Sequence, residues 1–314
     1  MKHLFIINPA AGKKNSSVDF VKKIAALCKP QGLDYDIKVS AYKGNCTELA
    51  RQAAKTGKEY RIYACGGDGT LNEVINGVVG YDNVAVTHFP GGSGNDFIRM
   101  FDHPEAFSDL SRLLDADEAK MDLIKVNDTY AMNICSMGID ARICQAIPIY
   151  KRLPGLGGSA AYNLSTVVNV VKGIHRPYEV EIDGKTLVGN QTLICVCNGR
   201  FYGGGFYPVP DARPDDGMLD VLIIRDVSRF TVAKVVGHYK HGEYKNYPDL
   251  ITHYRVKELT VRSLKEDVIN ADGETTLGKE AHFSVVPSAI RYFYPKGLTY
   301  SAEPAKTEEE AVPV

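Results

Sequence analysis

The apolar positions in the first third of the chain repeat with two alternating periods. Short runs typical of strands lie at about residues 2–8, 35–39, 60–64 and 84–89. Stretches with helical spacing lie between or after them, at about residues 18–28, 47–55, 70–79 and 105–114. This alternation predicts a parallel sheet covered by helices, in which ligands gather at the carboxyl ends of the strands.

The pattern changes after about residue 126. Short strand-like runs with turn residues between them lie at about 179–182, 192–196, 219–224, 258–261, 283–286 and 290–294. Asp183-Gly184 is a strong hairpin signal. We therefore expect a second, mainly antiparallel β domain, with helices inserted near residues 160–171 and 231–239.

The expected domains are residues 1–125 and 126–297. Residues 298–314 contain Glu308-Glu309-Glu310 and are expected to form a disordered tail.

Composition and charge narrow the class of protein. The formal net charge of −1 supplies no basic excess, so nucleic acid is not an expected partner. Seven cysteines without a C-x-x-C pair indicate reduced, mostly buried thiols in a reducing compartment. The first strand begins almost at Met1, and no apolar run approaches the ~18 residues of a membrane span. A cytoplasmic globular protein is predicted.

The stretch Cys65-Gly66-Gly67-Asp68-Gly69-Thr70 carries the most informative chemistry. It follows a predicted strand and leads into a predicted helix. Its glycines allow close approach of a ligand, and the helix start directs unpaired N–H groups to the same place, which suits a phosphate. Asp68 suits a Mg²⁺ ion that accompanies the phosphates, because Mg²⁺ prefers hard oxygen ligands. The stretch predicts a Mg-nucleotide site.

Two further strand ends could join this site. Pro90 to Phe97 repeats the glycines followed by an acid, and its position after a neighbouring strand favours a shared phosphate site over a merely flexible loop. Asn8-Pro9-Ala10-Ala11-Gly12 is not a G-x-G-x-x-G motif. It is either a simple turn or a turn that contacts the nucleotide through Asn8.

Two acidic segments lie in the second half of the chain. Asp211 to Asp220 surrounds a tight glycine turn, which could coordinate Mg²⁺ or Ca²⁺ or could be a solvated turn. Asp272-Gly273 has the spacing of a hairpin turn. A carboxylate there could instead accept the proton of an acceptor hydroxyl during phosphoryl transfer.

In this order the segments resemble the soluble diacylglycerol kinase and lipid kinase family of bacteria, which is related to sphingosine kinases. The resemblance runs from about Leu4 to Pro295 and is carried by Asn8-Pro9, Gly66 to Val74, Gly92 to Phe97, Asp215-Asp216-Gly217 and Asp272-Gly273-Glu274. It implies an α/β first domain of NAD-kinase and phosphofructokinase type and an antiparallel β-sandwich second domain. A last strand at about residues 289–297 is implied to return to the first domain.

The resemblance implies an ATP- and Mg²⁺-dependent kinase of a lipid alcohol, most directly of diacylglycerol. The implied nucleotide-binding residues are Asn8, Pro9, Gly66, Gly67, Asp68, Gly69, Thr70, Gly92, Ser93, Gly94 and Asn95. Asp272 is implied as the base, with Glu274 as its companion. Asp68, Asp96 and Asp122 are implied as an acidic network near the catalytic Mg²⁺.

The resemblance also bears on three further segments of the chain. A structural metal is implied at the Asp216 carboxylate and the carbonyls of Arg213 and Met218. Gly44-Asn45-Cys46 replaces the Gly-His-Ala of many relatives, which leaves the contacts to the nucleotide base open. Ser136 to Asp140 is expected to shape the cleft rather than to take part in the chemistry.

Because the implied acceptor is a lipid, we expect the protein to bind peripherally at a membrane surface. The stretch from Ile147 to Pro177 combines an apolar stripe with basic residues, including Lys151 and Arg152. It either docks on anionic lipid or is a core-facing helix with a solvated basic end. The rival functions are a kinase of a sphingoid base, of another lipid alcohol or of NAD, and a non-catalytic nucleotide-binding regulator. A homodimer that pairs two copies through an exposed edge strand of the β domain is a further alternative.

Overall fold

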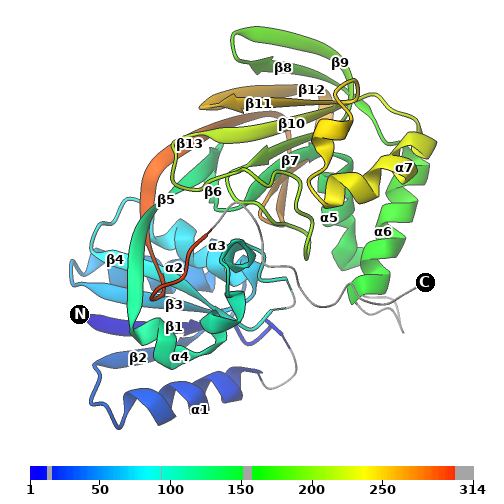
Figure 1. Ribbon diagram of the computed structural model, residues 1–314. Coiled ribbons are helices and arrows are strands. Elements are labelled where there is room, and N and C mark those ends of the chain that lie inside the picture. The colour runs from blue at the N-terminus through cyan, green and yellow to red at the C-terminus, as the bar shows by residue number, and fades with distance from the viewer. Residues whose placement is uncertain (13–15, 93, 151–157, 301–314) are drawn as a thin grey trace.

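The computed structural model describes residues 1–12, 16–92, 94–150 and 158–300 (Figure 1). Ser93, Lys151, Arg152 and the tail from Ser301 lie outside the described residues, so the expectations for them stay predictions. The chain forms two packed parts joined by a continuous path of paired strands.

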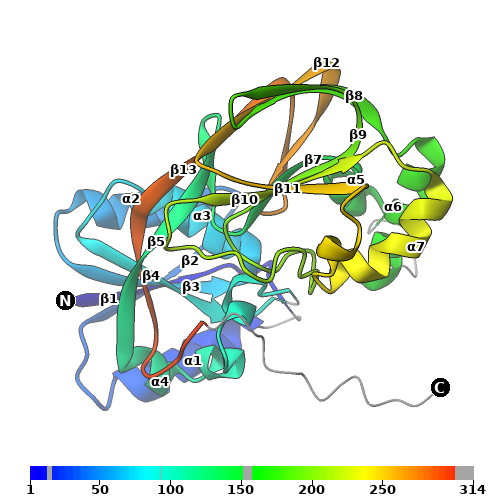
Figure 2. The same cartoon turned by 45° about the horizontal axis from the view of Figure 1, so that its top comes forward.

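The first part is a parallel sheet in the order β4-β3-β1-β2. Its strands are β1 (Lys2–Ile7), β2 (Tyr35–Val39), β3 (Tyr60–Gly66) and β4 (Val84–Pro90). Its helices are α1 (Ser16–Cys28), α2 (Asn45–Lys55), α3 (Asp68–Val78) and α4 (Leu110–Leu114), with short 3₁₀ turns at Phe97–Met100 and Pro104–Ser108. Helices α2 and α3 cover one face, and α1 and α4 lie on the other (Figures 1 and 2).

Apolar strands hold this layer together. Phe5 of β1 and Tyr63 of β3 are fully buried, and their rings stack with centroids 4.2 Å apart. Burial of such rings is among the larger contributions to core stability. The layer is therefore a firm base for the loops at its carboxyl edge.

One predicted helix is interrupted. The stretch at about 105–114 is a 3₁₀ turn followed by α4, because Asp109 adopts an extended conformation between them. The Asp109 carboxylate accepts the Ser111 N–H at 2.9 Å and so begins a new helix.

The second part contains antiparallel strand pairs. Its strands are β5 (Ala116–Val126), β6 (Thr129–Ala131), β7 (Ile134–Gly138), β8 (Arg176–Ile182), β9 (Lys185–Cys197), β10 (Leu219–Arg225), β11 (Ile251–Val256), β12 (Glu258–Ala271) and β13 (Glu274–Pro295). Its helices are α5 (Ile139–Tyr150), α6 (Gly158–Lys172) and α7 (Arg229–Lys240), with a 3₁₀ turn at Tyr244–Asn246. All three helices gather at one end of these strands (Figure 2).

Most of this second pattern agrees with the sequence. Asp183-Gly184 joins β8 to β9 with both residues at positive φ, so the predicted hairpin is confirmed. Helices α6 and α7 lie where helices were expected. Helix α5 was not predicted. It begins directly after Gly138, the last residue of β7, which has a φ of 111°, and it contains Pro148, which is unfavourable inside a helix.

Strand β13 connects the two parts. It pairs along its length with β12 and β5 and then runs parallel to β4, with Arg291 opposite Ala85 and Tyr292 opposite Val86. The segment that the family resemblance returns to the first domain lies in this strand. A register shift between Val286 and Ile290 marks the bend.

The sequence predicts unpaired cysteines and no membrane-spanning segment, and both can be compared with the structure. The seven cysteines are free, and all but Cys144 are buried. Within the described part of the chain, every helix is too short or too polar to cross a membrane.

The contact between α2 and α3 yields a test of the packing. A Cβ at Gly77 would lie 2.5 Å from the Thr47 carbonyl oxygen, so Gly77→Ala is expected to lower the free energy of unfolding by about 1–3 kcal/mol. Gly237→Ala in α7 is the matched control, since its Cβ would meet no described atom within 4 Å. It should raise the free energy of unfolding by up to about 1 kcal/mol. Urea denaturation measures both, and equal effects would contradict the packing argument.

Candidate active site

The two glycine-rich loops touch each other at the carboxyl edge of the parallel sheet. Gly91 N–H donates to the Gly66 carbonyl at 2.7 Å, and a Cβ at Gly92 would lie only 2.6 Å from the Gly67 Cα. Neither loop could approach the other so closely with a side chain at Gly92. The glycines that predicted a shared site therefore also hold the two loops together.

Asp68, the first residue of α3, binds the second loop. Its Oδ1 accepts the Asp96 N–H at 2.6 Å, and its Oδ2 accepts the Asn95 N–H at 2.8 Å. Asn95 adopts a positive φ of 52°, which turns both N–H groups toward one carboxylate. A Cβ at Gly94 would lie 2.6 Å from the Asp68 Oδ2. The sequence thus needs a glycine beside this acid.

Asn8 joins the same corner from the end of β1. Its Nδ2 donates to the Thr70 Oγ1 at 3.1 Å, and its Oδ1 accepts the Ala10 N–H at 3.0 Å. Thr70 packs over Gly66, where a Cβ would lie 2.3 Å from the Thr70 Oγ1. Three strand ends therefore converge, as their parallel order requires.

The Asp272-Gly273 turn of the second part reaches this corner. Asp272 and Gly273 form the hairpin turn between β12 and β13, with φ values of 49° and 91°. The Asp272 Oδ2 accepts the Asn72 Nδ2 of α3 at 3.4 Å. The turn therefore lies beside the helix that begins at Asp68.

Backbone N–H groups hold the Asp272 carboxylate. Its Oδ1 accepts the N–H groups of Asn133 at 3.0 Å and Ile134 at 2.9 Å, and its Oδ2 accepts that of Met132 at 2.6 Å. Burial raises the pKa of Asp272, and these hydrogen bonds oppose part of the rise. The sequence offered two interpretations of Asp272-Gly273, a hairpin turn and a carboxylate of the site. In the structure these residues form the turn, and the turn places the carboxylate.

Glu274 faces the nucleotide loops across a cavity. Its Oε2 pairs with the Lys43 Nζ at 2.6 Å, and its Oε1 lies 4.0 Å from where a Gly69 Cβ would be. The cavity has a volume of about 370 Å³. Its lining comes from both parts of the chain and includes Asn8, Pro9, Lys43, Gly67, Gly69, Thr70, Glu73 and Glu274.

Asp96 lies next to Asp68 and is also tied to the second part. Its Oδ2 accepts the Gly204 N–H at 2.9 Å. Burial first, and then the nearby charge of Asp68, raises the pKa of Asp96 to about 6. The charge of Asp272 adds to the rise, so the three carboxylates share one electrostatic environment.

Hard oxygen atoms at this corner would suit a Mg²⁺ ion. Asn95 Oδ1 and Asp96 Oδ1 are buried and accept no hydrogen bond from the described residues. Both are oxygen donors of the kind Mg²⁺ prefers. No cluster of three or more His, Cys, Asp or Glu side chains arranged for a metal occurs within residues 1–12, 16–92, 94–150 and 158–300. The catalytic Mg²⁺ stays a prediction.

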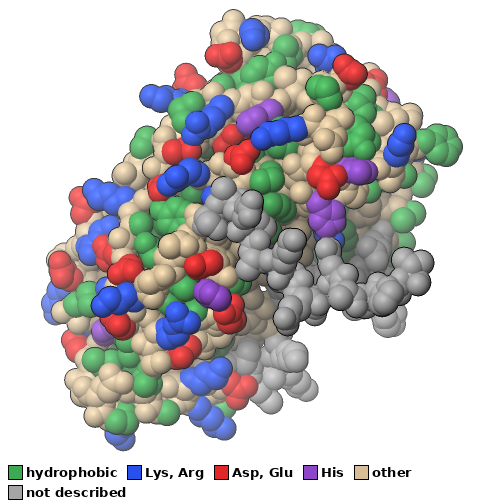
Figure 3. Space-filling view, in the orientation of Figure 1, with side chains coloured by type: hydrophobic (Ala, Val, Ile, Leu, Met, Phe, Trp, Pro, Cys, Tyr) green, Lys and Arg blue, Asp and Glu red, His purple; other side chains and the backbone are tan. Residues whose placement is uncertain are grey.

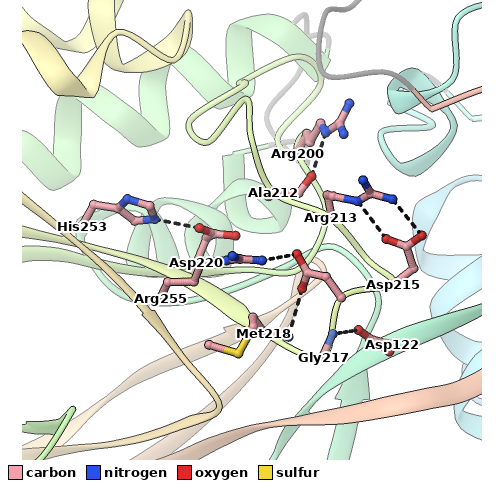
Figure 4. Close-up of polar contacts among 11 residues, drawn as sticks. Asp122, Arg200, Ala212, Arg213, Asp215, Gly217, Met218, Asp220, His253 and Arg255 are labelled. Carbon is pink, nitrogen blue, oxygen red and sulfur yellow. Dashed lines mark hydrogen bonds and ion pairs between the residues drawn. The ribbon is translucent and has the colours of Figure 1, made fainter.

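Asp122 lies on β5 and makes its described hydrogen bonds to other segments than Asp68 and Asp96 do, so its predicted place in the acidic network stays a prediction. Its Oδ1 accepts the Ser288 N–H at 2.7 Å. Its Oδ2 accepts the Gly217 N–H at 2.7 Å (Figure 4). These bonds tie β5 to the acidic loop and to the bend of β13. Asp122 therefore helps to order the second part of the chain.

The acidic loop at residues 211–220 is an ion-pair network. The Asp216 carboxylate accepts the Met218 N–H at 3.0 Å and pairs with the Arg255 guanidinium (Figure 4). Arg213 pairs instead with Asp215, with its Nε 3.1 Å from the Asp215 Oδ1. A cation at Asp216 would have to share this carboxylate with Arg255, so the described contacts do not favour the implied structural metal. It remains a prediction with Arg213 and Met218 as carbonyl ligands.

A second cavity was not predicted. It has a volume of about 390 Å³ and lies among α5, α6, α7, β9, β10 and the start of β11. Its lining is almost wholly apolar, with Ile143, Val170, Leu193, Val235 and Ile251 among the wall residues. Such a space fits an apolar ligand or a segment of one.

Asp140 is the acid in this apolar lining. Its Oδ1 accepts the Ala141 N–H at 2.6 Å, and its buried Oδ2 has no hydrogen-bond partner among the described residues. Burial raises the pKa of Asp140 to about 7, against the opposing hydrogen bonds of Ser136 and Ala141. The acid next to apolar residues, in Met137-Gly138-Ile139-Asp140-Ala141, was the available sequence signal.

The structure brings together most predicted site residues. Asn8, Asp68, Thr70, Asp96, Asp272 and Glu274 meet at one corner, whereas Asp122, Arg213, Asp216 and Met218 lie at the acidic loop. The sequence did not assign a role to Lys43 or Asn72. Lys43 follows the end of β2, and the convergence of parallel strand ends was the signal that could have found it.

Two family models match the chain. The model for the diacylglycerol kinase catalytic domain matches residues 2–126. The model for the YegS C-terminal NAD kinase beta sandwich-like domain matches residues 133–294. Together they describe the two parts seen in the structure.

Similar curated proteins cover most of the chain. A Staphylococcus epidermidis (strain ATCC 12228 / FDA PCI 1200) protein named "Putative lipid kinase" is 26% identical over 283 residues, which cover 88% of this chain and 90% of the relative. A Staphylococcus aureus (strain MSSA476) protein named "Putative lipid kinase SAS0691" is 29% identical over 278 residues, which cover 85% and 88%.

Solved structures share the fold. A structure titled as a putative diacylglycerol kinase from Bacillus anthracis str. Sterne has a TM-score of 0.73 at 23% identity, covering 94% of this chain and 97% of that one. Another from the same organism, titled as a diacylglycerol kinase, has a TM-score of 0.68 at 18% identity, covering 95% and 98%.

The contact between Asp68 and Asp96 can be tested by titration. Asp68→Asn removes a neighbouring negative charge, so the pKa of Asp96 should fall from about 6 toward its ordinary range. Carboxyl carbon chemical shifts followed against pH measure this change. Asp109, an exposed helix cap, is the control and should titrate unchanged in the variant. An unchanged Asp96 pKa would show that the two carboxylates do not interact.

Proposed function

Because the chain belongs to the diacylglycerol kinase family of lipid kinases, we propose that it transfers a phosphoryl group from ATP to the hydroxyl of a lipid alcohol, most directly diacylglycerol. The observation that carries the proposal is the position of the Asp272 turn against α3, beside the two glycine loops. The Asp272 carboxylate then lies close to the glycine loops, which suit a phosphate.

The nucleotide fits the 370 Å³ cavity and the loops around it. The N-terminus of α3 and the glycine backbones at Gly66, Gly67 and Gly92 offer N–H groups and close approach to the phosphates. Lys43 would supply a positive charge on the opposite wall, since the phosphates can compete with Glu274 for its ammonium group.

Asp68 and Asp96, with the free Asn95 Oδ1, would hold Mg²⁺, which would neutralise charge on the phosphates when bound. Asp68 has both oxygens engaged by N–H groups, so the remaining oxygens are the Asn95 Oδ1, which accepts no hydrogen bond from the described residues, and the Asp96 Oδ1, which lies 3.4 Å from the Arg99 Nε. The protein contributes mainly orientation and charge stabilisation, because phosphoryl transfer needs little covalent work from side chains.

Asp272 is the proposed base for the acceptor hydroxyl. Three backbone N–H bonds fix its position, and its raised pKa favours proton acceptance. The Asn72 contact, at 3.4 Å, is the longest of its hydrogen bonds. The incoming hydroxyl would replace this contact, while Glu274 remains next to the phosphates.

The second cavity favours a lipid over NAD or a polyol as the acceptor. Its apolar walls match acyl chains rather than a soluble, polar acceptor. Helix α5 connects it to the proposed base, because Ile143 lines the cavity and the neighbouring Cys144 Sγ lies 3.4 Å from the Gly273 carbonyl oxygen. A lipid held there would have its head group near Asp272.

Mass spectrometry of a lipid extract incubated with the protein, ATP and Mg²⁺ tests the activity and identifies the acceptor. A phosphorylated lipid that appears only with ATP is expected. Asp272→Asn should lower its rate of formation by about 10²–10⁴-fold with nucleotide binding retained.

Asp183→Asn is the matched control for this variant. Asp183 occupies the same position of an Asp-Gly hairpin turn, with a φ of 52°, but lies on the β8–β9 hairpin. Its activity should be unchanged. ATP binding without any phosphorylated product would favour the regulator, and product from NAD alone would favour a soluble acceptor.

The cost of placing Asp140 in an apolar wall can also be measured. Since its pKa is raised to about 7, the folded state holds a proton that the unfolded state loses at lower pH. Its contribution therefore becomes less favourable as pH rises from about 4 to 7. Asp140→Asn should raise the free energy of unfolding at pH 8 by about 2–4 kcal/mol and by much less at pH 4.5.

Urea denaturation at the two pH values measures this difference. Asp109→Asn is the control, because the pKa of Asp109 is lowered by its bond to Ser111 and any effect should have the opposite sign. A gain in the Asp140 variant that does not depend on pH would contradict the ionisation argument.

A further inference from the structure

Helices α6 and α7 present exposed apolar side chains side by side. Phe230 is 89% exposed, Val171 64% and Val167 60%. The Arg229 Nη2 donates to the Val171 carbonyl at 2.8 Å, so the start of α7 lies against the end of α6. Hydrophobic side chains gather along this edge of the molecule (Figure 3). We refer to Val167, Val171, Lys172, Arg229, Phe230 and Lys234 as the α6–α7 face.

The charge on this face has one sign. Neither α6 nor α7 contains an acidic residue, although the chain has 38. Lys172, Arg229 and Lys234 are exposed there. Isolated exposed apolar residues are common on soluble proteins. Chance exposure alone does not explain why the charged residues beside these apolar ones on α6 and α7 are all basic.

The acids that flank the two helices in sequence are already paired. The Asp226 Oδ1 lies 2.7 Å from the His175 Nδ1, and Glu243 pairs with His238. The three basic residues of the face, Lys172, Arg229 and Lys234, outnumber these two carboxylates. The formal charge of the whole chain, −1, conceals this local excess.

The apolar cavity opens on the same side. Val167 of α6 and Val236 of α7 both line it, and they are 60% and 44% exposed. Side chains that belong to a cavity wall and also face solvent mark its mouth. The mouth therefore lies between the two helices that carry the basic and apolar residues.

We propose that the α6–α7 face docks on an anionic bilayer, with Phe230 inserted among the head groups and the cavity mouth directed at the lipid. The inference rests on the proposed lipid kinase function and names the surface through which its acceptor enters. Apolar side chains flanked by Lys and Arg bind the interface by combining apolar burial with attraction to anionic lipid. A diacylglycerol molecule could then leave the bilayer without crossing water.

Co-sedimentation with phosphatidylcholine vesicles, with and without phosphatidylserine, tests this docking. The assay uses the whole chain and contains neither ATP nor diacylglycerol, so its result does not depend on turnover. Wild type should bind the phosphatidylserine vesicles more tightly. Phe230→Asp with Lys234→Glu should weaken that binding by at least about tenfold, because reversal of one lysine alone changes two charges at the surface.

A matched variant pair supplies the control. Leu264, 81% exposed, and its exposed neighbour Lys265 lie on β12, and Leu264→Asp with Lys265→Glu makes the same chemical change there. This variant should bind vesicles like wild type. Both double variants should keep the wild-type melting temperature, since the four side chains are exposed.

Several outcomes would overturn the docking. They are equal loss in the two double variants, equal binding with and without phosphatidylserine, and no binding by wild type. A wild-type dimer that becomes monomeric in the Phe230 variant would assign the face to a second copy of the chain instead. Phosphorylation of diacylglycerol in detergent micelles is measured separately, so failure of docking is distinguished from failure of the kinase function.

Discussion

The site depends on the way one carboxylate is held between the two parts of the chain. Asp272 accepts N–H groups from three consecutive residues, Met132 to Ile134, and an amide N–H from α3. A buried carboxylate without such donors would be costly or would become protonated. The donors therefore position the acid and keep it ionisable, which the proposed role of Asp272 as a proton acceptor requires.

Asp68 is held by the same kind of contact. Its two oxygens accept N–H groups of Asn95 and Asp96, and this contact requires the close approach permitted by the glycines. Each of the two acids is thus bonded to the backbone of another segment of the site. Since both acids are fixed before a ligand arrives, little reorganisation is needed on binding.

Local patterns predicted the glycine loops and the Asp-Gly turn, because a strand end or a two-residue turn is specified by a few neighbouring residues. The contacts of Asp122 could not be predicted, for the opposite reason. Its partners, Gly217 and Ser288, are remote in the sequence, and nothing near Asp122 indicates them. The apolar cavity was also missed, since its wall comes from three helices and three strands, and α5 was not recognised. The sequence therefore gave no indication of the apolar residues that surround Asp140.

Strand β13 limits how the chain can be divided. The first 126 residues contain the nucleotide loops, yet the outer side of β4 pairs with Arg291 and Tyr292 near the far end of the sequence. A fragment that stops after residue 126 would leave that strand edge bare, and bare edges promote aggregation. During synthesis, the nucleotide half must wait for the last part of the polypeptide to emerge before its sheet is complete.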